Sequence, residues 1–168
     1  MSLSNQKQLK LYKKLTEIGI KKANNKDFSG AEKDFLKAIK LDKKNPYAYI
    51  NLSNIYIIHK KINKAVKILM DYVYKYKHNE MILNHTAKFL YTYNLKEDLL
   101  ELFNHTKLNI NKNIKKNYYL YFIQGLYFEK EEKYQNAKDS FSRSILCNDN
   151  HFEGYIKLLN LYEQTNEL

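Results

Sequence analysis

The side chains that most often carry out chemistry in proteins are scattered along this sequence. The five histidines are His59, His78, His85, His105 and His151. None of them pairs with another at a spacing of four residues, and no set of cysteines or carboxylates accompanies them at the spacing of metal ligands. The four glycines are isolated, so the sequence has neither a phosphate-binding loop nor a nucleophile elbow. We therefore expect no metal, no cofactor and no catalysis in this chain.

The elements that must position any functional group recur along the chain with a period of about 34 residues. The units begin at Tyr12, Pro46, Glu80 and Tyr118, and a shorter fifth begins at Phe152. Counting each unit from 1, position 8 holds Gly19, Ser53, Ala87 and Gly125. Position 20 holds Ala31, Ala65, Leu99 and Ala137, and position 24 holds Phe35, Leu69, Phe103 and Phe141. Apolar positions 4, 7 and 11, and then 17, 20, 24 and 27, step by three and four, which predicts two helices per unit.

The alternation of small and large residues has a steric reason. Two antiparallel helices approach to roughly 8–10 Å only where the side chains at the crossing point are small, and positions 8 and 20 are such points. The large residue at position 24 is expected to fill the space between one unit and the next. The core is then continuous along the stack, and each unit depends on its neighbours.

This pattern resembles the tetratricopeptide repeat family. The first unit matches it with Leu15, Ile18, Gly19, Phe28, Ala31, Phe35 and Ala38. The resemblance implies an all-α fold, a right-handed α-solenoid of antiparallel helix pairs with about four units and a C-terminal capping or truncated helix. We expect one array over residues 1–168, with units at 12–45, 46–79, 80–117 and 118–151 and a terminal helix at 152–168.

The third unit departs most from the pattern. Lys96 and Leu99 replace an aromatic and a small residue, and the next unit begins only at Tyr118, so four residues have been added. The polar stretch from Asn109 to Asn117 is the predicted place of the insertion. Two interpretations remain: a degenerate repeat whose second helix is slightly displaced, which we favour, or a kink that reshapes the binding face.

The chain end leaves a similar choice. The segment from Phe152 to Leu168 has the pattern of a first helix with no second helix after it. It is either a solvating cap or the cut edge of a longer array. We slightly favour the second, because Leu168 stands where position 17 would open the next helix.

The net charge of +11 raises the possibility of nucleic-acid binding. Arg143 is the only arginine among the 29 basic residues, whereas bidentate recognition of phosphates and bases favours arginine. The lysines are spread over most units, and we interpret them as solvated surface residues. Nucleic acid is therefore not the favoured partner.

Compartment and cysteine use follow from composition. No apolar run approaches the roughly 20 residues that cross a bilayer, and the N-terminus lacks a secretory signal. We expect no membrane span and a cytoplasmic chain. The lone Cys147 excludes a disulfide framework and is expected to be a small core residue.

A binding surface remains, and the family's geometry places it on the first helices, where positions 2, 5, 6, 9, 12 and 13 point away from the second helix. Asparagine there offers both a donor and an acceptor to a peptide backbone, and aromatic residues bury apolar side chains at a low entropic cost. The predicted peptide-binding groove is lined by Tyr47, Ile50, Asn51, Asn54, Asn84, His85, Lys88, Tyr91, Tyr119 and Phe122.

One subtype of the family can be tested by residue. Co-chaperone repeats hold a partner's C-terminal carboxylate with basic and asparagine residues at five positions. These positions hold Thr16, Ile20, Asn51, Met81 and His85 here. Only Asn51 matches, and a buried carboxylate needs convergent cations, so chaperone tails are disfavoured.

The prediction for function is a protein-interaction scaffold that binds a peptide or partner protein in its concave groove, without catalysis. The alternative is the N-terminal recognition module of a larger enzyme, such as a glycosyltransferase or a sulfotransferase. A basic helical repeat that binds nucleic acid ranks third.

Overall fold

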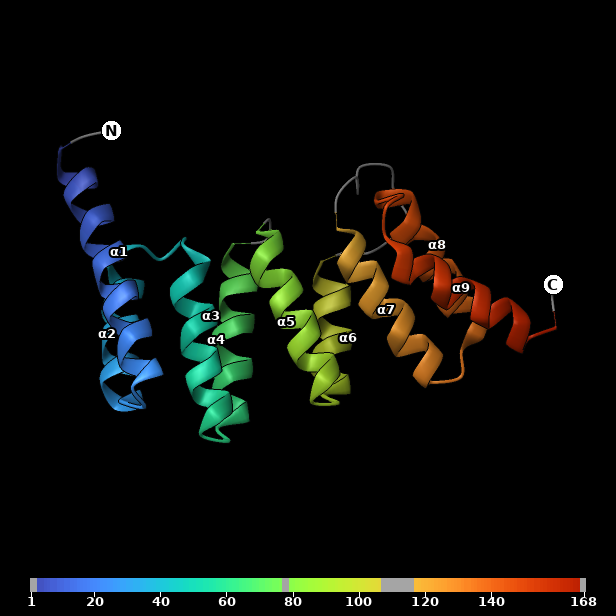
Figure 1. Ribbon diagram of the computed structural model, residues 1–168, viewed down its shortest axis with the longest axis horizontal. Helices are drawn as coiled ribbons and strands as arrows, with labels where there is room; N and C mark the ends of the chain where they lie inside the picture. Colours follow the sequence, from blue (N-terminus) through green and yellow to red (C-terminus); the bar gives the residue numbers. More distant parts are fainter. Residues whose placement is uncertain (1–2, 77–78, 107–116, 167–168) are drawn as a thin grey trace. The chain divides into compact units, whose positions relative to one another are not determined.

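The computed structural model describes residues 3–76, 79–106 and 117–166, and over these residues the chain forms nine α-helices (Figure 1). In chain order they are α1 (Leu3–Asn24), α2 (Phe28–Leu41), α3 (Pro46–Ile58), α4 (Ile62–Lys75), α5 (Glu80–Thr92), α6 (Lys96–His105), α7 (Tyr118–Lys130), α8 (Tyr134–Cys147) and α9 (Phe152–Gln164). Short turns join the two helices of each unit, so they run antiparallel. The all-α class and the paired helices expected from the sequence are confirmed.

The helix boundaries follow the predicted register closely. The unit starts at Pro46, Glu80, Tyr118 and Phe152 are each the first residue of a helix. Position 17 opens every second helix, at Phe28, Ile62, Lys96 and Tyr134. The exception is α1, which begins at Leu3 rather than at Tyr12. The repeat period therefore predicts both where a unit begins and where its second helix begins.

The chain also divides into two compact units that are larger than a repeat, Met1–Thr86 and Ala87–Leu168, with the boundary inside α5. From here on, first unit and second unit mean these two parts. In the first unit α1 packs on α2, α3 packs on α4, and α2 packs on α3 (Figure 1). In the second unit α7 packs on α8 and α8 packs on α9. Each unit therefore has a core of its own, and the single array over residues 1–168 stays a prediction.

The turn inside each repeat uses a left-handed residue, and this residue marks the period independently of side-chain type. Among the described residues, five that are not glycine have φ between 54° and 63°: Lys26, Lys60, Asn94, Glu132 and Asn166. Successive members are one repeat period apart, except that Asn94 and Glu132 are separated by four positions more than the others. Equivalent backbone hydrogen bonds close the turns in different repeats: Lys61 N donates to Tyr56 O at 2.8 Å, and Lys133 N donates to Phe128 O at 2.9 Å. These are the six-to-one bonds of a Schellman motif.

The longer separation places the added residues between the turns at Asn94 and Glu132. Within that interval α6 stops at His105, four residues short of the length of α2, α4 and α8. The stretch where the insertion was predicted lies outside the described residues, apart from Asn117. Asn117 itself caps α7, where its side chain accepts from Leu120 N at 3.1 Å.

Side-chain caps fix the starts of three first helices and of one second helix. Asn45, Asn79 and Asn117 stand directly before three first helices, and each side chain accepts a backbone N–H of the first turn. Before the second helices only Asp27 makes such a bond among the described caps, with Gly30 N at 2.9 Å. The start of a second helix therefore depends more on the turn before it than on its own cap.

The small residues at positions 8 and 20 lie where the two helices of a repeat meet. Ala31, Ala65 and Ala137 are fully buried. A Cβ added at Gly19 would lie 2.7 Å from Cε1 of Phe35, and one at Gly125 would lie 2.5 Å from Cδ1 of Phe141. The ring at position 24 thus packs on the glycine at position 8 of the same repeat.

The ring of Phe141 also contacts the following repeat. A core cluster in the second unit joins Phe122, Ala137 and Phe141 to Leu161 of α9. Position 24 therefore fills space inside its own repeat as well as between repeats, which widens the role expected from the sequence. One buried ring links three helices.

In the other repeats, the second helix covers one face of the first helix. The equivalent face of α9 is exposed among the described residues. Tyr155 stands at position 4 with 46% of its surface exposed, whereas Tyr49 and Tyr121 at the same position are buried. Leu159, at position 8, is also exposed. After α9 the backbone again turns left-handed, at Asn166. A first helix without a covering second helix was expected here, and both explanations for it, a cap or a cut edge, stay open.

Replacing a left-handed lysine by glycine is expected to stabilise the fold. Lys60 has a φ of 57°, where a Cβ is unfavourable and glycine is not. Lys60→Gly should raise the free energy of unfolding by about 1 kcal/mol, measured by urea denaturation. The matched control is Lys14→Gly in the middle of α1, which should lower it by about 1 kcal/mol. Destabilisation by both variants would contradict this interpretation of the turn.

Candidate peptide-binding surface

The first unit carries four of the predicted groove residues on α3. Asn45 caps this helix by accepting a hydrogen bond from Tyr47 N at 3.3 Å, which fixes where the helix begins. Tyr47 and Asn54 are exposed, and Ile50 and Asn51 are partly exposed. The four side chains step by three, one and three residues along the helix, so they share one face.

The two asparagines of α3 differ in what they can offer a ligand. Asn51 Nδ2 donates to the carbonyl of Tyr47, one turn earlier, at 2.8 Å. Asn54 is exposed and makes no hydrogen bond with the other described residues. The amide of Asn51 is therefore already engaged with its own helix, and Asn54 is the better candidate for a contact with a peptide backbone.

His85 links the start of α5 to α3. Its Nε2 lies 3.1 Å from Ser53 Oγ, and the same hydroxyl donates its one hydrogen to Ile50 O at 2.7 Å. Ser53 can therefore only accept from the ring, so Nε2 of His85 carries the proton. This bond joins position 8 of one first helix to position 6 of the next and fixes the orientation of the imidazole.

Asn84, beside His85, is partly buried. Its Oδ1 is shielded from solvent and has no hydrogen-bond partner among the described residues. An unsatisfied buried acceptor is costly, and a ligand cannot reach a shielded atom. Any contact of Asn84 with a peptide would therefore have to use the amide nitrogen.

In the second unit Lys88 and Tyr91 lie on α5, with Lys88 exposed and Tyr91 half-buried. Burial raises the pKa of the Tyr91 phenol, with a further increase from Glu129 and an opposing effect of Lys157. Lys157 Nζ binds both carboxylate oxygens of Glu129, at 2.9 and 3.0 Å. Tyr91 thus lies near a closed ion pair between α7 and α9.

The remaining two predicted residues lie on α7. Tyr119 is half-buried, and burial, then the charge of Glu153, raises its pKa. Phe122 is only 8% exposed. Its ring lies 5.7 Å from that of Phe141 and 4.7 Å from that of His151, centre to centre. Most of the Phe122 side chain therefore belongs to the core, and little of it is left for a ligand.

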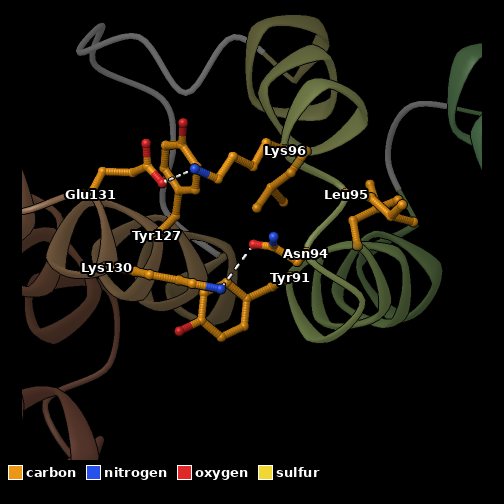
Figure 2. A pocket seen from close by; sticks show the side chains of 9 residues that line it. Tyr91, Asn94, Leu95, Lys96, Tyr127, Lys130 and Glu131 are labelled. Carbon is orange, nitrogen blue, oxygen red and sulfur yellow. Dashed lines mark hydrogen bonds and ion pairs between the residues drawn. The ribbon is translucent and has the colours of Figure 1, made fainter.

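Sequence reasoning missed a crevice formed by the α5–α6 turn and the end of α7. Figure 2 shows Lys130 directed toward Asn94, and Lys96 directed toward Glu131. The Nζ atom of Lys130 lies 2.8 Å from Asn94 Oδ1, and that of Lys96 lies 2.5 Å from Glu131 Oε1. The pair raises the pKa of Lys96 and lowers that of Glu131. The cavity of about 10 Å³ has room for a single water molecule, so these bonds close the crevice to larger ligands.

The middle of the first compact unit is similar in sequence to a known protein family. A family model described as tetratricopeptide repeat matches residues 35–67, from the middle of α2 into α4. Residues 35–67 therefore carry tetratricopeptide-repeat sequence. This match covers the end of one repeat and most of the next, where the left-handed turn at Lys60 and the buried Ala65 follow the period.

Solved structures support the tetratricopeptide-repeat fold over most of the chain. PilF from Pseudomonas aeruginosa aligns with a TM-score of 0.71 and 16% identity, over 95% of this chain and 71% of PilF. MamA aligns with a TM-score of 0.67 and 18% identity, over 93% of this chain and 83% of MamA. A tetratricopeptide repeat protein from Parabacteroides merdae aligns with a TM-score of 0.68 and 18% identity, over 94% of this chain and 61% of that protein. At these identities the likeness is one of fold. A comparison with curated protein sequences gives no match.

The four carboxylate-binding positions that do not match the co-chaperone pattern all lie in the first compact unit. Thr16 is buried, and its hydroxyl donates to Tyr12 O at 3.0 Å. Ile20 and Met81 are exposed but apolar. His85 is held by Ser53, as described above. These side chains do not converge as cations on one point, and chaperone tails stay a disfavoured partner.

The part of the chain that the structure describes contains no group of three or more histidine, cysteine, aspartate and glutamate side chains that could hold a metal ion. Cys147 is half-buried, and burial raises the pKa of its thiol. No helix in the described ranges has the length and apolar character needed to cross a membrane.

Proposed function

We propose that this chain is a non-catalytic scaffold that binds an extended or helical segment of a partner protein on its first helices. The observation that supports it most is the exposure of large apolar side chains at the same repeat position. Tyr47 of α3 and Met81 of α5, both at position 2, are 53% and 43% exposed. Single exposed apolar residues are ordinary, but their recurrence at a position that faces away from the second helix favours a binding surface.

The chemistry around these residues suits a polypeptide ligand. Asn54 offers both a donor and an acceptor to a peptide backbone. The Tyr47 ring can cover an apolar side chain while losing little rotamer freedom. Partner proteins of unknown identity are therefore the proposed ligands, and the ten-residue groove stays a prediction.

Removing the two amides of α3 should weaken binding and spare the fold. We expect Asn51→Ala with Asn54→Ala to lower the affinity for a bound peptide by about tenfold, since few residues of an interface carry most of its energy. Peptides would be selected on the full chain from a displayed library of random sequences, and their affinities measured by fluorescence anisotropy.

The matched control moves the same change to second helices. Asn63 of α4 and Asn136 of α8 are exposed, and Asn63→Ala with Asn136→Ala should leave both affinity and melting temperature unchanged. Equal affinities for the two double variants would place the site away from α3. A library that yields no peptide for the wild-type chain would count against peptide binding altogether.

A further inference from the structure

The net positive charge of the chain lies entirely in one of its two compact units. Residues 1–86 contain 18 lysines and seven acidic residues, a net charge of +11. Residues 87–168 contain 11 basic and 11 acidic residues, a net charge of zero. Tyrosine, by contrast, occurs seven times in the first unit and nine times in the second. A general compositional bias would not separate the charge in this way.

Equivalent repeat positions change sign between the units. Position 22, on the outer side of the second helix, holds Lys33, Lys67, Glu101 and Asp139 in successive repeats. Position 15, the left-handed turn residue, holds Lys26, Lys60, Asn94 and Glu132. All eight residues are exposed, so packing does not explain why lysine occurs at these two positions only in the first two repeats.

The acidic residues of the first unit are largely used inside it. Asp34 is buried and pairs with Lys22 at 2.6 Å. Glu32 accepts from Tyr56 Oη at 3.1 Å, and Asp27 caps α2. Asp42 accepts from the backbone N–H of Lys44 at 3.1 Å. Four of the seven carboxylates are therefore bound to groups of their own unit, and of these four only Asp34 pairs with a lysine among the described residues.

The lysines themselves are exposed. We use the name lysine face for Lys33, Lys37 and Lys40 on α2 and for Lys67 on α4, which stands at the same repeat position as Lys33. The three on α2 are spaced at i, i+4 and i+7, so they share one side of the helix. Among the described residues none of the four makes an ion pair, and Leu36 lies on the same helix with 39% of its surface exposed.

We propose that the lysine face binds an acidic segment of a partner protein, rich in aspartate or glutamate. Lysine acts as a point charge, which suits carboxylates spaced along a flexible chain. The first unit has no arginine, the residue that favours bidentate phosphate recognition, so a protein is favoured over nucleic acid. Leu36 can contact an apolar side chain of such a segment. A single exposed leucine on α2 is too little for insertion into a lipid surface.

This surface is distinct from the proposed peptide site. It lies on the second helices α2 and α4, whereas Tyr47, Asn54 and Met81 lie on the first helices α3 and α5. A partner could therefore bind both surfaces, or each could take a different partner. Failure of one proposal leaves the other intact.

The test measures binding of a fluorescein-labelled glutamate decapeptide to the full chain by anisotropy, at about 50 mM salt. Lys33→Gln with Lys67→Gln should weaken binding about fivefold, because each exposed charge pair contributes modestly. Wild-type binding should also weaken as salt is raised to about 200 mM, since exposed charges are screened. Circular dichroism of each variant checks the fold.

A second variant separates the surface from net charge. It adds Asn104→Lys and Asn136→Lys, at exposed positions of α6 and α8, to the same two glutamine substitutions, which restores the net charge of the wild type. Binding should stay weak in this variant. Recovery to the wild-type level would overturn the assignment to the lysine face, and so would absence of decapeptide binding. Tighter binding of a thymidine decanucleotide than of the decapeptide at about 200 mM salt would overturn the assignment to an acidic protein.

Discussion

Gly125→Val is expected to destabilise the second unit by about 3 kcal/mol. A Cβ at this position would lie 2.5 Å from two ring atoms of Phe141, closer than real Cβ contacts. The ring has no room to withdraw, because Phe141 is fully buried and packs in a cluster with Phe122 and Leu161. Urea denaturation followed by far-ultraviolet circular dichroism would measure the change.

The control keeps the same new side chain and removes the clash. Asn160 is exposed on α9, and Asn160→Val should change stability by no more than about 0.5 kcal/mol, since the two residues have similar helix propensities. A smaller ring should also relieve the clash, so Gly125→Val combined with Phe141→Leu should cost less than the sum of the single changes. Additive effects would show that position 8 and position 24 do not meet.

The register was predictable because the steric rule behind it is local. Helices cross closely only where a side chain is small, so the recurrence of glycine, serine and alanine at position 8 marks each crossing. The positions of the turns were harder to predict from the sequence. Every left-handed turn residue described here is lysine, asparagine or glutamate rather than glycine, so composition carries no sign of them, and only the period does.

The candidate surface was predictable as a face but not residue by residue. The register shows which positions point outward, yet side-chain torsions decide what each group does. The amide of Asn51 turns back to its own helix, and the hydroxyl of Thr16 does the same. Phe122 turns its ring into the core. These choices depend on neighbours that a repeat pattern does not specify.

The crevice in Figure 2 could not be predicted from the sequence, for a different reason. Its two closing bonds join Asn94 to Lys130 and Lys96 to Glu131, residues that belong to consecutive repeats. The interval contains the four added residues, so the register of one repeat against the next could not be derived from the period alone. The same holds for the division of charge, which has meaning only once the unit boundary is known.

The first unit should lose stability steeply between about pH 10 and pH 12, through buried tyrosines. Burial raises the pKa of Tyr49, Tyr56 and Tyr72 to about 12 in each case. Two of them hold the loop between α2 and α3, where Tyr49 Oη donates to Lys43 O and Tyr72 Oη to Lys44 O. Ionisation of either phenol would remove that donor.

The sign follows from proton binding. In the unfolded chain a tyrosine loses its proton near pH 10, whereas in the folded chain these three keep it until about pH 12. Between those values the folded state binds more protons, so the free energy of unfolding falls as pH rises, by about 1.4 kcal/mol per pH unit for each group. The contribution is complete below pH 10 and lost above pH 12.

Urea denaturation at a series of pH values from about 9 to about 11.5 would measure this slope. Tyr72→Phe removes one titrating group together with its bond to Lys44 O, so the variant should be less stable at pH 9 but should lose stability less steeply, by about 1.4 kcal/mol per pH unit. Tyr155→Phe, at an exposed position of α9, is the matched control and should leave the slope unchanged. If Tyr72→Phe shows the full wild-type slope, the phenol of Tyr72 is not among the groups that keep their protons in the folded chain, and the alkaline loss of stability must come from elsewhere.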